Sequence, residues 1–124
     1  MFWGEKLILK DLSQLNFTAS QVFKSLKYYD FQFIKSKNSR CLMVSLVLHN
    51  DKKEIPESIR KELRNKNILI LDNPRFIIHN NGIWRAIFTI FDKSDLIKVK
   101  DEEAEIEKRN TTNKRRKQFQ RKLK

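Results

Sequence analysis

Glycine, proline and cysteine are scarce in this chain of 124 residues. Two glycines and two prolines exclude collagen-like and flexible-linker architectures. The single cysteine, Cys41, excludes an intrachain disulfide and suits a reducing compartment. The apolar runs are too short to span a bilayer, and the N-terminus lacks the basic and apolar regions of a signal peptide. We therefore expect an intracellular protein that does not insert into a membrane.

Positive charge is abundant and unevenly distributed. The chain carries 27 Lys and Arg against 15 Asp and Glu, a formal net charge of +12. Residues 1–99 hold 17 basic and 10 acidic groups, whereas residues 100–124 hold 10 and 5 and few large apolar side chains. Such a segment buries too little apolar surface to fold alone. We therefore expect a small α+β domain at residues 1–99 and a charged, partly helical or disordered basic tail at residues 100–124.

Two periodic patterns open the chain. Residues 6–12 form a short apolar run with polar ends, which is typical of a buried strand. Thr18 and Gln21 then have the spacing of a helix capping box. Because the apolar residues that follow share one helical face, the sequence predicts a helix after Thr18. This face consists of Ala19, Val22, Phe23 and Leu26.

The later periodicities predict a second helix and a sheet. Pro56 beside Glu57 marks a helix start, and Asn80-Asn81-Gly82 is a hairpin signal. The resulting order is β-α-β-β-α-β with an extra β-hairpin, which predicts a ferredoxin-like split β-α-β sandwich with one sheet face free to bind. Strands or brief apolar runs are expected at residues 31–35, 41–49, 68–71, 76–79 and 83–91.

The predicted order and one hexamer resemble an RNA-recognition motif domain over residues 5–92. In that family the first strand carries a hexamer with the order aliphatic residue, aromatic residue, aliphatic residue, any residue, Asn, Leu. Here residues 7–12 read Leu-Ile-Leu-Lys-Asp-Leu, with Ile8 in the aromatic position and Asp11 in place of the asparagine. Residues 39–47 stand in the place of the family's second motif and keep only its basic start, Arg40.

The resemblance implies a sheet that contacts RNA, but not by base stacking. In the family, aromatic side chains on the open sheet face stack on bases. Ile8, Leu42 and Val44 cannot stack, so the sheet of this degenerate member is expected to face an RNA backbone or another protein. These three residues form the predicted protein interface. Other ferredoxin-like domains, including several ribosomal-protein folds, and some other α+β arrangement remain open as alternatives.

The basic tail is the most specific functional signal. Its last eleven residues hold seven Lys and Arg and no acid, and cations near phosphates release condensed counterions. A nuclear import signal or a solubilising tail remains open for the same residues. A basic loop and a Trp-Arg pair add a guanidinium and an aromatic plane suited to RNA. The predicted RNA-binding residues are Lys10, Lys35, Lys37, Arg40, Trp84, Arg85, Lys114, Arg115, Arg116, Lys117, Arg121 and Lys122.

No pattern in the sequence predicts catalysis, a cofactor or a metal site. His49 and His79 lie 30 residues apart without neighbouring ligands, and neither a glycine-rich phosphate loop nor a nucleophile elbow is present. We therefore predict a non-catalytic RNA-binding subunit of a ribonucleoprotein particle, in the nucleus, nucleolus or cytoplasm, with other protein subunits as partners. The alternatives are a protein-assembly module and a viral or plasmid DNA-binding protein.

Overall fold

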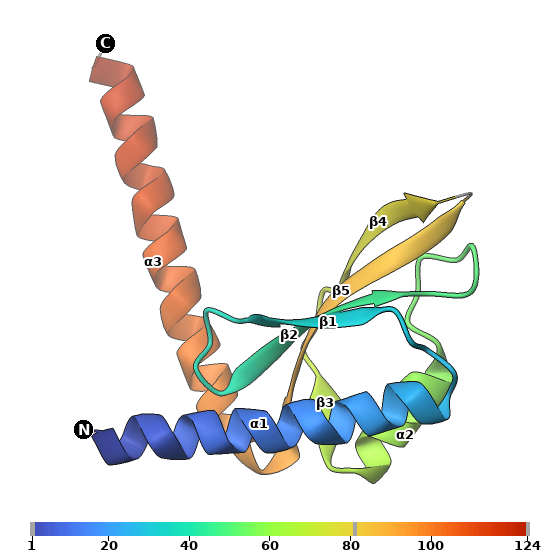
Figure 1. The fold of residues 1–124 in the computed structure, drawn as a ribbon. Coiled ribbons are helices and arrows are strands. Elements are labelled where there is room, and N and C mark those ends of the chain that lie inside the picture. Colours follow the sequence, from blue (N-terminus) through green and yellow to red (C-terminus); the bar gives the residue numbers. More distant parts are fainter. Residues whose placement is uncertain (1, 81, 124) are drawn as a thin grey trace.

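The computed structural model describes the backbone of residues 2–80 and 82–123 and the side chains of residues 12–80 and 82–110. Within these residues it forms an α+β fold of three α-helices and an open antiparallel sheet of five strands. Helices α1 and α2 lie along one face of the sheet, and α3 projects from its end (Figure 1). The elements are α1 (Phe2–Ser25), β1 (Phe31–Lys35), β2 (Cys41–Val47), α2 (Glu57–Asn65), β3 (Ile68–Ile70), β4 (Arg75–Asn80), β5 (Ile83–Asp92), a 3₁₀ turn (Lys93–Asp95) and α3 (Leu96–Leu123).

Strand β5 organises the sheet. Residues 85–91 of β5 pair with β2 on one side, while β4 and β3 share the other side of β5, β4 near its start and β3 near its end. β1 completes the sheet beyond β2. Since successive side chains of a strand point to opposite faces, Ala86, Phe88 and Ile90 lie on the helix side and Arg85 and Ile87 on the other side.

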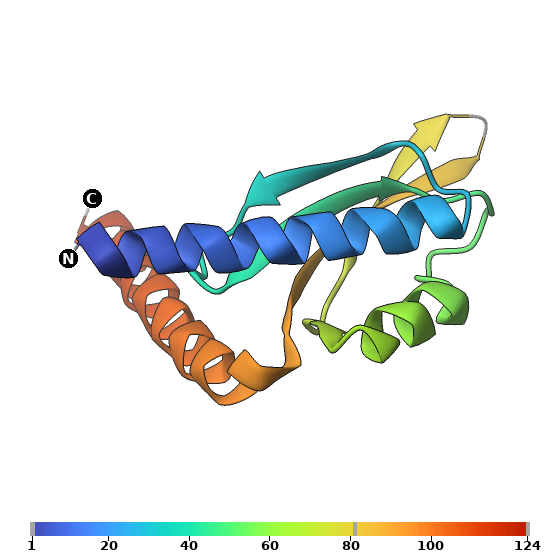
Figure 2. The same cartoon turned by 60° about the horizontal axis from the view of Figure 1, so that its bottom comes forward.

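The main core lies between the sheet and helices α1 and α2. The α1 residues Ala19 and Phe23 are completely buried, as are Ile59 and Leu63 of α2. The Phe23 ring lies 5.2 Å from the Phe31 ring and 6.3 Å from that of Phe88, centroid to centroid, in tilted and edge-on arrangements that aromatic quadrupoles favour. The view in Figure 2 shows α1 and α2 side by side beneath the strands.

A second, smaller core lies on the opposite face and holds the first turns of α3. Cys41, Phe91 and Val99 are at most 2% exposed, and Leu96 packs against them. Because Val99 is buried on the sheet, α3 begins as part of the domain and continues outward to Leu123 without a break. The predicted division at residue 99 falls inside this helix.

The predicted ferredoxin-like order is wrong. Residues 6–12 lie in α1, not in a strand, so the chain begins with one long helix and the β-α-β-β-α-β order is absent. Leu12 and Leu15 continue the helical spacing of Ala19, and no glycine or proline lies between residues 5 and 29 to interrupt the helix. Thr18 is therefore an internal residue of α1. The hexamer at residues 7–12, on which the RNA-recognition motif resemblance rests, is helical.

The other periodicities are confirmed. The strand predicted at residues 31–35 has the bounds of β1, the later predicted strands overlap β2, β3, β4 and β5, and α2 starts directly after Pro56. Leu42 and Val44, however, do not face an open surface as predicted. They are 8% and 0% exposed and belong to the core beneath α1 and α2, so they are not accessible to a partner protein.

Candidate nucleic-acid interface

The loop between β1 and β2 is tied to the start of α3 by its central asparagine. Asn38 is 1% exposed, and its side-chain amide donates a hydrogen bond of 3.1 Å to the carbonyl oxygen of Val99. Its Oδ1 accepts from the backbone N–H of Arg40, also at 3.1 Å. A single buried side chain therefore links the shape of the loop to the position of the helix.

Two flanking contacts strengthen this link. The backbone N–H of Ser39 donates to one carboxylate oxygen of Glu102, and the Ser39 hydroxyl donates to the other at 2.7 Å. Arg40 Nη1 lies 3.7 Å from Asp95 Oδ1 at the turn before α3. We use the name loop–α3 contact for the six residues Asn38, Ser39, Arg40, Asp95, Val99 and Glu102. Three consecutive loop residues thus contact the helix start or the turn before it.

The loop–α3 contact places one of the three predicted loop cations, Arg40, beside an acid. Lys35 and Lys37 are exposed, whereas Arg40 is half-buried and paired. Burial raises the pKa of the adjacent Cys41 thiol to about 12, with further contributions from the negative charges of Glu103, Glu102 and Asp95. The first turns of α3 are therefore locally acidic, and Lys35 and Lys37 are the loop cations that remain exposed for a ligand.

The predicted basic cluster lies on the far part of α3. Residues 114–123 belong to the same helix that starts at the loop–α3 contact, but their side chains are outside the described residues, as are those of Lys10 and Ile8 on α1. At about 1.5 Å per residue, Lys114 lies roughly 22 Å along the helix from Val99. The fold therefore joins the loop and the basic cluster by one continuous helix and separates them by about four helical turns.

Trp84 and Arg85 lie apart from this junction and already have partners. The Trp84 indole N–H donates to the carbonyl oxygen of Asp51 at 2.9 Å, and Lys53 Nζ lies 4.6 Å from its ring centroid. Arg85, the next residue of β5, points to the opposite face of the sheet, where its Nη1 donates to Ser45 Oγ at 2.7 Å. Since Trp84 also packs against the main core, its ring is engaged within the fold and is a weak candidate for base stacking.

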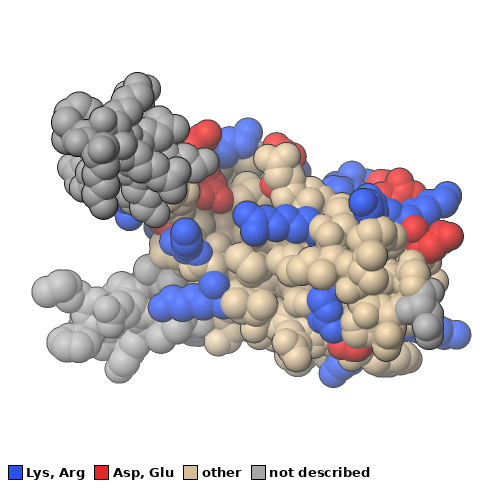
Figure 3. Space-filling model, turned by 90° about the horizontal axis from the view of Figure 1, so that it is seen from above, with Lys and Arg blue, Asp and Glu red and all other residues tan. Residues whose placement is uncertain are grey.

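The sheet face opposite α1 and α2 carries a largely uncharged patch with both basic and acidic side chains around it (Figure 3). Ile34 and Ile77 on this face are 45% and 51% exposed, and Met43 and Ile87 are half-buried between them. Arg75 is exposed beside Ile87. We call these five residues the open face. Sequence reasoning missed them because it assigned the inward residues of β2 to the binding side, although the alternation along β5 contained the signal.

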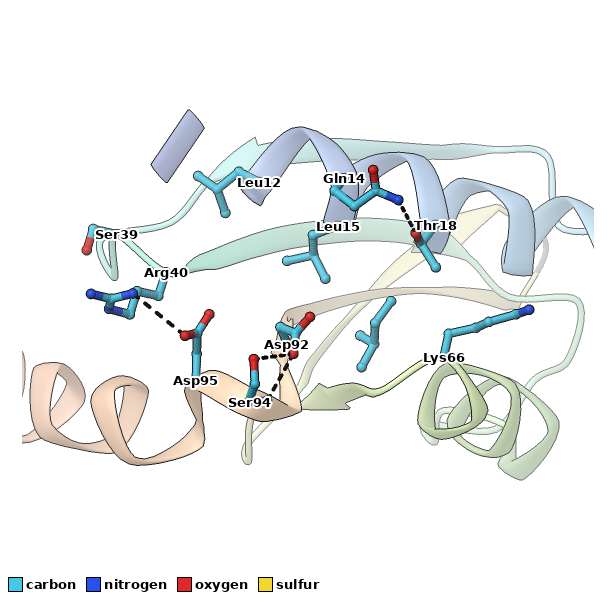
Figure 4. Close-up of a pocket in the computed structure, with 11 residues that line it drawn as sticks. Leu12, Gln14, Leu15, Thr18, Ser39, Arg40, Lys66, Asp92, Ser94 and Asp95 are labelled. Carbon is cyan, nitrogen blue, oxygen red and sulfur yellow. Dashed lines mark hydrogen bonds and ion pairs between the residues drawn. The ribbon is translucent and has the colours of Figure 1, made fainter. Parts of the chain in front are cut away.

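A cavity of about 200 Å³ lies between α1 and the ends of β2 and β5 (Figure 4). Leu15 and Ile68 form apolar parts of its wall. Arg40 points across it toward Asp95, and Asp92 accepts hydrogen bonds from the N–H and hydroxyl of Ser94 at 2.9 and 2.7 Å. Its two cations, Arg40 and Lys66, are balanced by the two carboxylates, so this cavity has no charge preference for a phosphate.

Among the described side chains, no group of three His, Cys, Asp or Glu residues is placed to hold a metal ion. His49 Nε2 lies 3.0 Å from the carbonyl oxygen of Lys27, and its ring stacks on Tyr28 with the centroids 4.6 Å apart. Both contacts are structural. In the same part of the chain, no helix has the length and apolar character needed to cross a bilayer.

No protein-family model, curated protein or solved structure matches this chain. The class of the protein is therefore given by its own architecture, a five-stranded antiparallel sheet with two helices on one face and a long helix anchored on the other.

Proposed function

We propose that the protein binds RNA through the sugar–phosphate backbone, as a non-catalytic subunit of a ribonucleoprotein particle. The observation that carries the proposal is the loop–α3 contact, which joins two separately basic segments of the sequence in one structural unit. Lys35 and Lys37 lie near the start of α3, and residues 114–123 at the far end of this helix include six basic residues. An RNA that meets both segments gains from both sets of charges.

The charge pattern along α3 separates the two sets of contacts. The acidic residues at positions 101–107 disfavour phosphate along the first turns of the helix, whereas residues 114–124 favour it. A ligand that reaches from Lys35 and Lys37 to the basic end must extend over roughly 20 Å. We therefore expect oligonucleotides shorter than this span to bind more weakly than longer ones.

The open face supports recognition that does not depend on base identity. Bases in single-stranded RNA are held mainly by stacking on aromatic rings or guanidinium planes. The open face carries aliphatic side chains, Met43 and one exposed arginine, Arg75, but no aromatic side chain. Contacts to phosphate are consequently the main expected source of affinity, and binding should tolerate changes of RNA sequence.

The proposal is tested by the salt dependence of RNA binding to the full-length chain. Replacing Lys114, Arg115, Arg116 and Lys117 by Gln should lower the slope of log affinity against log salt by about 3, at about 0.7 per phosphate contact. Lys35→Gln with Lys37→Gln should lower it by about 1.4. The matched control replaces Lys52 and Lys61, exposed cations away from the loop–α3 contact, and should leave the slope unchanged.

Two results would contradict the proposal. One is a flat salt dependence for the unmodified chain, and the other is an equal loss in the control and in the basic-end variant. Competition between RNA and DNA of the same sequence and length distinguishes the alternative of a DNA-binding protein, because a clear preference for DNA would replace RNA as the ligand.

A second function, protein assembly, is favoured by one observation. Ile34 and Ile77 of the open face remain about half exposed, and an uncovered apolar sheet face is typical of a protein-binding surface. We propose that another subunit of the particle covers this face. The triple variant Ile34→Ser, Ile77→Ser and Ile87→Ser should lose assembly with the particle proteins while its RNA salt slope is unchanged, and retained assembly would refute this function.

A further inference from the structure

A groove crosses the outer edge of the sheet at β3, on the side away from the loop–α3 contact. β3 is the last strand in the order β1-β2-β5-β3, and α2 and the start of α3 flank it. The groove encloses about 280 Å³. Its floor is apolar and its rim is charged. We call it the β3 groove and define it by Arg60, Arg64, Leu69, Leu71, Leu96 and Lys100.

The backbone of β3 presents hydrogen-bonding groups to this groove. On the inner side, the N–H of Leu71 donates to the carbonyl oxygen of Thr89, and the carbonyl oxygen of Asn67 accepts from the N–H of Lys93, both at 2.8 Å. In an antiparallel ladder, residues that bond to the partner strand alternate with residues whose backbone N–H and C=O groups point away from it. The N–H and C=O groups of Ile68 and Ile70 therefore point toward the outer edge, where an added strand would lie.

The rim of the β3 groove is positively charged. Arg60 and Arg64 come from α2 and Lys100 from α3, so cations stand on both sides of the strand edge, against the single carboxylate of Asp72. Arg64 Nη2 lies 2.6 Å from Glu57 Oε1, but both side chains are more than half exposed. Exposed ion pairs contribute little free energy, so this guanidinium can exchange its partner for that of a ligand.

These features fit an acidic peptide better than RNA. Leu69, Leu71 and Leu96 offer no plane on which a base stacks, but they do offer contacts for aliphatic side chains. The exposed edge of a strand pairs with any extended chain that reaches it. Carboxylates at alternate positions of such a chain all point to one face, where they would meet Arg60 and Arg64 of α2, while the residues between them would face Leu69, Leu71 and Leu96.

We propose that the β3 groove binds an extended acidic segment of a partner protein, which adds as a strand to the edge of β3. Its aliphatic side chains pack on Leu69, Leu71 and Leu96, and its carboxylates, on the other face of the added strand, pair with Arg60 and Arg64. The site is separate from the proposed RNA-binding surface, so a protein partner and RNA can bind the same molecule together.

The test titrates the full-length, ¹⁵N-labelled protein with a short capped peptide of alternating Glu and Val, followed by NMR. We expect saturable shifts at the amides of Ile68 and Ile70 and a Kd below about 1 mM. Arg60→Glu or Arg64→Glu should weaken binding by about fivefold or more. Lys61→Glu, the matched control on α2, should leave the affinity unchanged because Lys61 does not line the groove.

Three outcomes would overturn the proposal. They are the absence of saturable shifts at Ile68 and Ile70, equal binding of a matched peptide of alternating Lys and Val, and displacement of the acidic peptide by an RNA oligonucleotide. The last result would assign the groove to RNA. A peptide in which proline replaces the central valine separates strand addition from charge alone, since it lacks a backbone donor and should bind more weakly. Failure of the peptide to bind leaves the RNA salt slope unaffected, so the two proposals fail independently.

Discussion

Replacing Asn38 by alanine removes the buried centre of the loop–α3 contact. The substitution deletes one hydrogen bond to the carbonyl oxygen of Val99 and one from the N–H of Arg40. The Val99 oxygen keeps its place in the helical hydrogen-bond ladder, but the Arg40 N–H loses its partner in a half-buried loop. With about 1 kcal/mol for each hydrogen bond and a further contribution for the unsatisfied donor, we expect a loss of about 2–3 kcal/mol.

Urea denaturation followed by circular dichroism measures this loss, and a thermal melt should show a decrease in Tm of about 8–12 °C. Amide hydrogen exchange adds a local readout, because the first turns of α3 should lose protection more than α1 does. Asn65→Ala, at the exposed end of α2, is the matched control and should change stability by less than about 0.5 kcal/mol. An Asn38→Ala protein as stable as this control would refute the reasoning that one buried amide fixes the helix.

Three further perturbations test other parts of the fold. Val44→Asp places a carboxylate where exposure is 0%, so it should unfold the domain by circular dichroism, whereas Met43→Asp, one residue away on the open face, should leave it folded. Gly82→Ala should lower the free energy of unfolding, measured by urea denaturation, by about 1 kcal/mol, because Gly82 has φ +79°. No atom lies within 4 Å of the added Cβ, so the loss comes from the backbone alone, and an unchanged urea midpoint would contradict this. Folding raises the pKa of the Cys41 thiol from 9.0 to about 12, so the contribution of this group to the free energy of unfolding is complete below pH 9 and is lost as the pH rises toward 12. Cys41→Ala should therefore lose less stability between pH 9 and pH 12 than the unmodified chain. An identical dependence of stability on pH would contradict this.

The middle of the chain was predictable because its elements depend on local patterns. Alternation placed β1 and β5, and Pro56 with Ile59 and Leu63 placed α2. The beginning was not predictable in the same way, since the short apolar run at residues 6–12 fits a strand and a helix equally well by its apolar content. The wrong choice there changed the whole topology, because one missing strand removes the ferredoxin-like order.

The candidate site was predictable only in its parts. Charge clustering identified the basic loop and the basic end of the chain, but not that a helix connects them. The contact of Asn38 with Val99 joins residues 61 positions apart through a single polar side chain, and such a contact leaves no periodic signal in the sequence. The β3 groove was missed for a related reason, because its arginines and its leucines come from three different elements.

The central position of β5 governs when the protein can fold during synthesis. β2 is buried along almost its whole length, and its partner strand lies as far as 50 residues later, as in the pairing of Cys41 with Phe91. At about 5–20 residues per second, the ribosome needs roughly 2–9 s to proceed from the end of β2 to the end of β5. Throughout that interval β2 lacks its β5 partner, so we expect late, long-range pairing of these strands to be the slow step of folding.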